Sequence, residues 1–176
     1  MPNWAEGNIR IRGKRQNVIH FLQEELKPLF FVDDRQHHKY GYEERPIEIE
    51  PNAGGYELIL RKNAETEPEV YFCGSQRQFI DFGQGNEIIA EISDDHLHQR
   101  DDQVVFLNGF KGAWSSDDKY FMDKAVQHKV DIRIFMWEKG MEWSRVATWY
   151  RDGKYAEESR TYANWLWESA LPDYGG

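Results

Sequence analysis

The sequence is poor in cysteine, in long apolar runs and in positive charge, and each shortage excludes a class of protein. The only cysteine, Cys73, excludes an intrachain disulfide framework and a four-cysteine zinc site. No apolar stretch approaches the ~20 residues of a membrane-spanning helix, and the chain does not begin with a secretion signal. These features predict a cytoplasmic protein that makes no contact with a membrane.

The charge balance is acidic. Lys and Arg number 22 and Asp and Glu number 31, which gives the 176-residue chain a formal net charge of -9. A surface of this sign repels the phosphate backbone of nucleic acids unless a local basic patch is present. We therefore expect no general nucleic-acid binding.

Recognisable catalytic motifs are also missing. There is no G-x-S-x-G nucleophile elbow, and Gly83–Asn86 lacks the Lys-Ser or Lys-Thr pair of a phosphate-binding loop. Cys73 lies in an apolar strand candidate, where a buried and unreactive side chain is the common finding. Glu138 and Glu142 flank a predicted hairpin turn and are interpreted as solvated carboxylates. The sequence therefore favours a protein without enzymatic activity and without a cofactor.

The clearest pattern that is present covers Val104–Gly153, which has the pattern of strand, helix, strand and strand. Ser115, followed three residues later by Asp118, forms a capping box that predicts the start of the helix. After the helix, apolar residues recur with the period of two that buries one face of a strand. These alternating residues are Val130, Ile132, Ile134 and Met136.

The N-terminal part predicts one strand and one helix. The strand covers Asn8–Arg12 and closes at Gly13, and the helix covers residues 14–29, with Pro28 ending its regular part. Residues 31–45 and 93–103 are charged and rich in breaks, and are interpreted as loops. Beyond Gly153, a final helix around residues 162–167 and a strand beginning at Tyr155 both stay open.

The middle of the chain predicts short strands separated by polar turns. The strand candidates are Ile47–Glu50, Tyr56–Lys62, Val70–Gly74, Phe79–Gly83 and Glu87–Ser93. Together the elements predict a single domain over residues 1–176 of the α+β class, with a ferredoxin-like antiparallel sheet that has helices on one face. Residues 1–30 and 104–155 supply this core, 31–103 form a β-rich insertion, and 156–176 are a C-terminal extension.

Two groups of residues resemble a known family. They are Met1-Pro2-Asn3-Trp4 with Asn8 and Gly13 behind it, and Phe110–Ser115 followed by a helix, Trp137–Gly140, Trp143 and Asp152-Gly153. In this order and spacing they resemble the YubB-like ferredoxin-like proteins of bacteriophages, plasmids and prophages. The resemblance implies a mobile-element origin and a compact α+β fold. It implies no catalytic residue, and it does not extend to the middle of the chain.

Aromatic residues are the excess that needs an explanation, because the chain contains seven Trp. Four of them lie in the C-terminal third as candidate binding residues: Trp114, Trp137, Trp143 and Trp149. One interpretation is that they form the core, since aromatic side chains bury large areas. The other is a partly exposed aromatic surface of the kind enriched where proteins bind partners.

The preferred functional hypothesis is a non-enzymatic protein-binding or regulatory module from a phage or plasmid. Its partner would be an unidentified host or phage protein, bound through the aromatic surface or a loop edge. An exposed edge strand could also pair with a second copy of the chain, which would give a homodimer.

The alternative hypothesis is a metal-dependent enzyme or small-ligand binder that uses histidine and aspartate loops. His96 and His98 beside Asp94 and Asp95 offer imidazole and carboxylate ligands at a usable H-x-H spacing. A second pair of histidines, His37 and His38, follows Asp33 and Asp34. The histidines at positions 20 and 128 lie in predicted helices and are interpreted as surface or capping residues.

Overall fold

The computed structural model describes residues 4–37, 39–73, 75–94, 101–164 and Glu168, and it is dominated by β-structure. Within these residues, 56% lie in strands and 17% in helices. The elements in chain order are β1 (Trp4–Lys14), α1 (Arg15–Glu25), β2 (Leu26–Asp34), the 3-10 turn η1 (Arg35–His37), β3 (Lys39–Glu44), β4 (Glu48–Pro51), β5 (Glu57–Arg61), β6 (Glu69–Phe72), β7 (Ser75–Asp81), β8 (Glu87–Asp94), β9 (Asp102–Ala113), α2 (Asp118–His128), β10 (Asp131–Glu138), β11 (Trp143–Trp149) and β12 (Tyr155–Thr161).

All twelve strands belong to one sheet that forks at β9. One edge of β9 pairs with β1 along its whole length, whereas the other edge pairs first with β8 and then, beyond Gly109, with β7. Gly109 is the extra residue of a bulge between β9 and β1, and its φ of +79° is a conformation that favours glycine. A side chain there would also approach the carbonyl oxygen of Asp81 to 3.0 Å. The bulge therefore separates two branches, β8-β5-β4 and β7-β6-β2-β3.

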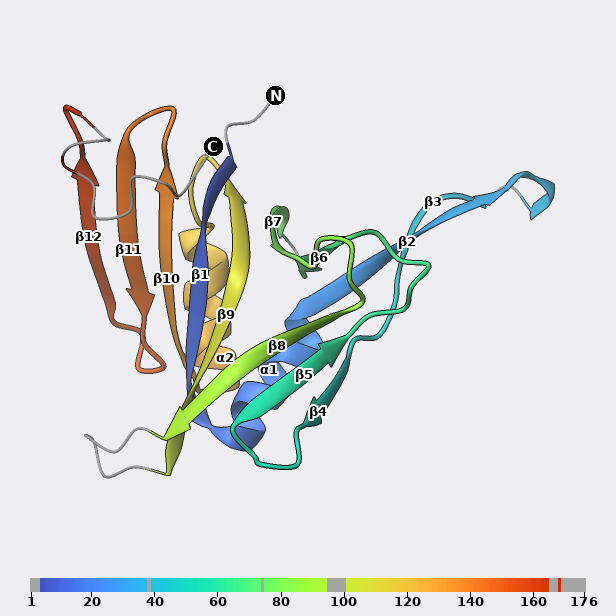
Figure 1. Cartoon of the computed structure of the whole chain (residues 1–176), viewed down its shortest axis with the longest axis horizontal. Helices are drawn as coiled ribbons and strands as arrows, with labels where there is room; N and C mark the ends of the chain where they lie inside the picture. The colour runs from blue at the N-terminus through green and yellow to red at the C-terminus, as the bar shows by residue number, and fades with distance from the viewer. Residues whose placement is uncertain (1–3, 38, 74, 95–100, 165–167, 169–176) are drawn as a thin grey trace.

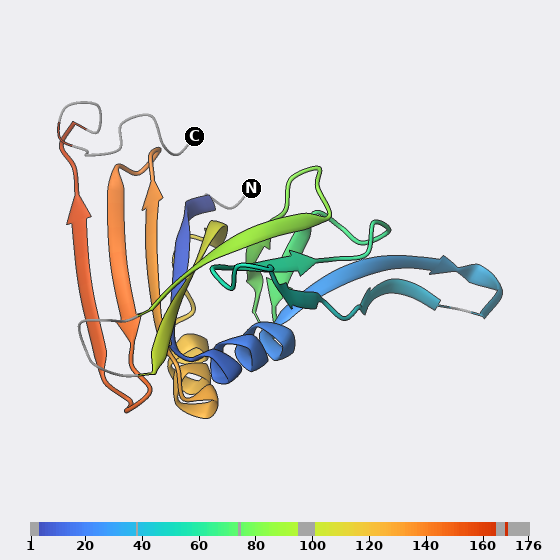
Figure 2. The ribbon, with the colours of Figure 1, turned by 60° about the horizontal axis from the view of Figure 1, so that its bottom comes forward.

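Two regions of this sheet differ in how they are covered. The helix-backed region is β11-β10-β1-β9, and α1 and α2 pack behind it, side by side (Figure 1). The arm is the branch β7-β6-β2-β3, and its β2–β3 hairpin projects away from the helices in both views (Figure 2). One part of the sheet is therefore covered by helices, and another part projects away from them.

The main core lies between the helices and the helix-backed region. Phe21 and Leu22 of α1 and Phe121 of α2 are fully buried, and Phe121 stacks on Trp149 of β11 with the ring centroids 5.1 Å apart. The N-terminus of α2 is capped by Asp117, whose side chain accepts a hydrogen bond from the backbone N–H of Tyr120. The predicted helix is confirmed, but its cap is Asp117 and not Ser115.

The predicted α+β ferredoxin-like fold with a β-rich insertion is wrong. The described residues form a β-rich fold with two α-helices, and residues 31–103 supply strands to the same sheet. The helix predicted over 14–29 ends at Glu25, and the loop predicted over 31–45 is largely the β2–β3 hairpin. That loop was inferred from charge, but a strand with little burial on either face carries charge on both and loses its period of two.

At the C-terminal end the structure decides between two alternatives for part of the chain. The strand beginning at Tyr155 is present as β12, an exposed edge strand. Of the helix predicted around residues 162–167, residues 162–164 are not helical, and residues 165–167, including Trp165 and Trp167, lie outside the described residues. No helix in the described part of the chain combines the length and apolarity needed to cross a membrane.

Candidate functional site

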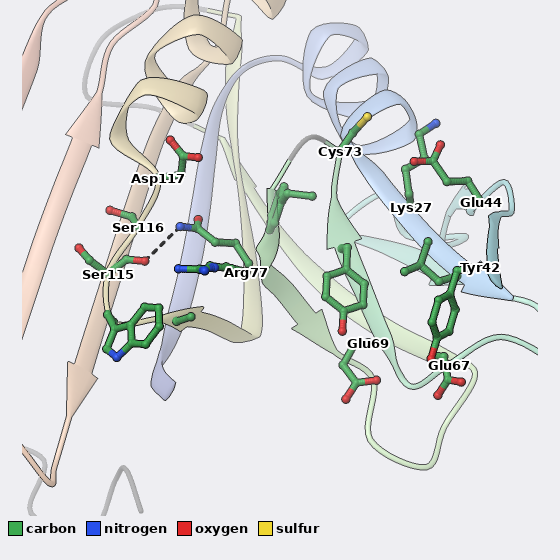
Figure 3. A pocket seen from close by; sticks show the side chains of 16 residues that line it. Lys27, Tyr42, Glu44, Glu67, Glu69, Cys73, Arg77, Ser115, Ser116 and Asp117 are labelled. Atoms are coloured by element: carbon green, nitrogen blue, oxygen red, sulfur yellow. Dashed lines mark hydrogen bonds between the residues drawn. The ribbon is translucent and has the colours of Figure 1, made fainter. Parts of the chain in front are cut away.

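A hollow of about 1130 Å³ lies between the arm and the loop that joins β9 to α2 (Figure 3). We call it the groove. Its lining residues are Lys27, Leu29, Tyr42, Glu44, Glu67, Glu69, Tyr71, Phe72, Cys73, Arg77, Gln78, Ala113, Trp114, Ser115, Ser116 and Asp117. Residues from four strands of the arm thus face a loop that the helix-backed region holds.

Aromatic rings run across the arm beside and within the groove. Tyr71 of β6 lies 5.3 Å from Phe79 of β7, and Phe79 lies 5.1 Å from Trp4 of β1, measured between ring centroids. On the hairpin, Phe31 and Tyr42 are directly paired residues whose rings lie 5.3 Å apart. Since Trp4, Phe31 and Tyr42 are all exposed, this row presents apolar surface to solvent.

The charge of the groove is mixed but mainly negative. Its acidic residues are Glu44, Glu67, Glu69 and Asp117, and its basic residues are Lys27 and Arg77. Near these carboxylates, burial and the charge of Glu69 raise the pKa of the Tyr71 hydroxyl above its usual value. The groove therefore favours a cationic ligand over an anionic one.

Trp114 forms one wall of the groove and has an unusual backbone. Its φ is +63°, in the left-handed region that a bulky L-residue rarely adopts, and 52% of the residue is exposed. The guanidinium of Arg77 lies 4.9 Å from the centre of its ring. A large aromatic side chain is thus held exposed by a strained backbone, a combination that clusters at functional sites.

Arg145 of β11 fixes the loop that carries Trp114. Its guanidinium donates hydrogen bonds of 2.7 Å to Ser115 Oγ, Ser116 Oγ and the carboxylate of Asp118. Burial opposes the charge of Arg145, but the hydrogen bonds that it donates to the carboxylates of Asp118 and Glu157 outweigh this effect and raise its pKa. The arginine therefore stays charged and ties the loop to β11 and β12.

A second contact holds the loop from the arm. The side-chain amide of Gln78, on β7, donates a 3.1 Å hydrogen bond to the carbonyl oxygen of Ser115, and Gln78 is only 2% exposed (Figure 3). The loop is thus held by Arg145 from the helix-backed region and by Gln78 from the arm. These hydrogen bonds fix the position of Trp114 within the fold.

The four tryptophans predicted as binding residues fall into two pairs. Trp114 and Trp143 line a smaller hollow of about 350 Å³ on the other side of the loop. Trp137 and Trp149 are 6% and 0% exposed, so in this structure they are part of the interior. Trp114 is thus exposed, whereas Trp143 is half-buried and packs against the core, and no local signal in the sequence distinguishes these two from the buried pair.

The predicted metal loops are only partly described. His38, Asp95, His96 and His98 lie outside the described residues. The side-chain oxygen of Asp94 accepts a 2.9 Å hydrogen bond from Gln103, and His37 Nδ1 lies 2.8 Å from the carboxylate of Asp34. These contacts leave the metal hypothesis for the loops untested.

Two other residues weighed in the sequence have specific places. Glu138 is buried, and its carboxylate accepts hydrogen bonds from the backbone N–H groups of Gly140 (2.9 Å) and Met141 (2.5 Å). Glu138 therefore stabilises the β10–β11 turn. The prediction of a solvated carboxylate at this position is wrong. Cys73 is half-buried and lines the groove.

A cluster that the sequence interpretation missed joins the two helices. His20 and Glu24 of α1 and His128 of α2 place one potential ligand atom each within 4.8 Å of one another. Beside them, Glu25 is buried, and hydrogen bonds from Tyr120, His128 and Lys124 outweigh the effect of burial and lower its pKa. The available signal was the i, i+4 spacing of His20 and Glu24, which places both on one face of a helix.

Comparisons with protein-family models, with characterised proteins and with solved structures find no match to this chain.

Proposed function

We propose that this protein is a binding module whose groove holds an extended segment of a partner protein that carries basic and aromatic side chains. The observation that carries the proposal is Trp114, an exposed indole fixed in a left-handed backbone conformation above a groove. Exposed aromatic anchors surrounded by a pre-formed hollow are the usual centres of binding energy in protein interfaces. The mobile-element origin and the cytoplasmic location stay predictions.

The dimensions of the groove suit a polypeptide. Its volume of about 1130 Å³ is at or above the upper end of small-molecule sites, which span roughly 300–1,000 Å³. The four strands of the arm cover about 14 Å from β7 to β3 at the usual strand spacing, which matches about four extended residues. A short extended segment can therefore contact the aromatic row and Trp114 together.

The charges suit a basic partner. Four carboxylates and two basic side chains line the groove, so a Lys or Arg of the partner gains attraction near Glu67 and Glu69. The same charges disfavour an acidic peptide or a nucleic-acid strand, in agreement with the net charge of -9. Specificity would then come from charge, and affinity from the aromatic side chains.

The test is selection from a random-peptide phage library, followed by fluorescence anisotropy with the selected peptides. We expect selected peptides to contain Lys or Arg together with an aromatic residue. Trp114→Ala should weaken their binding about tenfold or more. The paired change Glu67→Lys with Glu69→Lys should weaken it similarly and reduce its salt dependence.

A matched control makes the same change of charge at two positions outside the groove. Glu48 on β4 and Glu91 on β8 are exposed and lie outside the groove lining. Glu48→Lys with Glu91→Lys should leave the affinity of the selected peptides unchanged. Selection without enrichment, or equal affinity for all these variants, would show that the groove is not a peptide-binding site.

A further inference from the structure

We propose that His20, Glu24 and His128 form a binding site for a zinc-class divalent cation that links α1 to α2. The site is separate from the groove, because none of the three residues lines it. It is also separate from the histidine loops considered in the sequence, because its residues come from two packed helices.

The donor atoms already have spacings close to those of a metal site. His20 Nε2 lies 3.2 Å from Glu24 Oε1, and His128 Nε2 lies 3.9 Å from Glu24 Oε2. Two ligands at zinc distances of about 2.1 Å in a tetrahedral arrangement are about 3.4 Å apart. Side-chain rotations would therefore bring all three atoms to coordination distance without moving either helix, and His128 Nε2 would exchange its contact with Glu25 for the cation.

The cluster combines one buried residue with two exposed ones. Glu24 and His20 form an exposed i, i+4 pair, a contact that contributes little by itself in water. His128, in contrast, has only 2% of its side chain exposed, and its imidazole packs edge-to-face on that of His20 with the centroids 5.5 Å apart. His128 thus lies on the buried side of the site, whereas His20 and Glu24 leave the other side open to solvent, from which a cation can enter.

Glu25 supplies a second carboxylate at the buried side of the site. Its Oε1 lies 2.8 Å from His128 Nε2, and it is held by a 2.6 Å hydrogen bond from the hydroxyl of Tyr120 and by Lys124 Nζ at 3.0 Å. This contact uses the nitrogen that would bind the cation, so the cation replaces the hydrogen bond between His128 and Glu25. Glu25 then contributes negative charge at the buried side of the site.

The ligand types indicate which cations fit. Two imidazoles and one carboxylate suit Zn²⁺, Co²⁺ and Ni²⁺, whereas Mg²⁺ and Ca²⁺ prefer sites made of oxygen ligands. Three protein ligands leave at least one coordination position for water. The inferred ligand is thus a late first-row divalent metal, with zinc as the probe.

The test is calorimetric titration of the full chain with ZnCl₂, supported by the absorption spectrum of the Co²⁺ complex. We expect one zinc per chain, and loss of affinity by about a hundredfold or more in His20→Ala and Glu24→Gln. Both side chains are at least 47% exposed, so these variants should fold, which circular dichroism will check. The matched control is His37→Ala, which removes an exposed histidine that also faces a carboxylate, on the hairpin.

Thermal melting gives a second readout. Zinc at a hundredfold excess over its dissociation constant should raise the melting temperature of the wild type by about 5–10 °C and leave that of His20→Ala unchanged. The proposal fails if the wild type binds no zinc. It also fails if His20→Ala binds zinc as the wild type does, while replacement of His96 and His98 by Ala abolishes binding. The groove variant Glu67→Lys with Glu69→Lys should bind zinc normally, so the two proposals can fail independently.

Discussion

The helix-backed region and the arm belong to one sheet but expose their side chains very differently. In β10 of the helix-backed region, Ile132, Ile134 and Met136 are fully buried beneath the helices. In β2 of the arm, burial is confined to the first residues, and Phe31 near its outer end is 39% exposed. The comparison teaches that burial, and with it stabilisation, is concentrated in one part of the sheet, so the exposed arm that lines the groove can be altered with little loss of stability.

The largest expected effect on stability lies in the helix-backed region. Trp149 is fully buried and stacks on Phe121, so Trp149→Ala should cost about 3–5 kcal/mol in the free energy of unfolding. Urea denaturation followed by circular dichroism will measure this loss. A cost below about 1.5 kcal/mol would mean that the region relaxes easily around the cavity, and the contrast with the arm would be lost.

A second effect in the helix-backed region depends on pH. Asp131 at the start of β10 is buried, which opposes its ionisation, but hydrogen bonds from Arg151 and Arg12 outweigh this and lower its pKa. A lowered folded-state pKa stabilises the protein above about pH 4 and loses this contribution as the pH falls further. Asp131→Asn should therefore cost about 2 kcal/mol at pH 7 and much less at pH 3.

Denaturation at a series of pH values will measure this difference. The control is Asp152→Asn, which alters an exposed carboxylate that pairs with its neighbour Lys154 in the turn after β11. Its effect should be small at every pH, because an exposed ion pair contributes little in water. If Asp131→Asn shows the same cost at pH 3 as at pH 7, the ion pairs of Asp131 do not contribute through its charge.

The sequence predicts the elements of the helix-backed region better than those of the arm. The strand around Ile132 and the helix containing Phe121 were predicted because burial on one face leaves a clear period in the residues. The hairpin strand containing Tyr42 was missed, because strands with little burial carry no such period. The fork at Gly109 was also beyond reach, since one glycine in a strand indicates a bulge but not the partners of each half.

The candidate sites show a similar limit. Trp114 was predicted as a binding residue, but no pattern around it separates it from the buried Trp149. The proposed metal site depends on the contact between α1 and α2, which brings His128 to residues 103 or more positions earlier in the chain. Contacts between residues so far apart in the sequence depend on how the helices pack. Only the proximity of His20 and Glu24, which lie on one helix, could be predicted from their spacing.

A smaller effect tests the strain in the loop between the two regions. Both Trp114→Ala and Trp114→Gly remove the contact with Arg77, but only Gly adopts a φ of +63° without cost. Trp114→Gly should therefore be more stable than Trp114→Ala by about 1 kcal/mol. Thermal denaturation of the two variants will test this. Equal stability would show that the left-handed conformation is not maintained after the indole is removed.

The smallest expected effect on stability lies in the arm and gives the sharpest form of the comparison. Tyr42 is 60% exposed and contacts Phe31 across the hairpin, so Tyr42→Thr, which keeps a strand-favouring residue, should cost only about 0.5 kcal/mol. The same change should weaken binding of the groove-selected peptides about tenfold, because the ring lines the groove. Urea denaturation and anisotropy on one preparation measure both quantities. A large loss of stability with unchanged binding would reverse the assignment and make the arm a structural element.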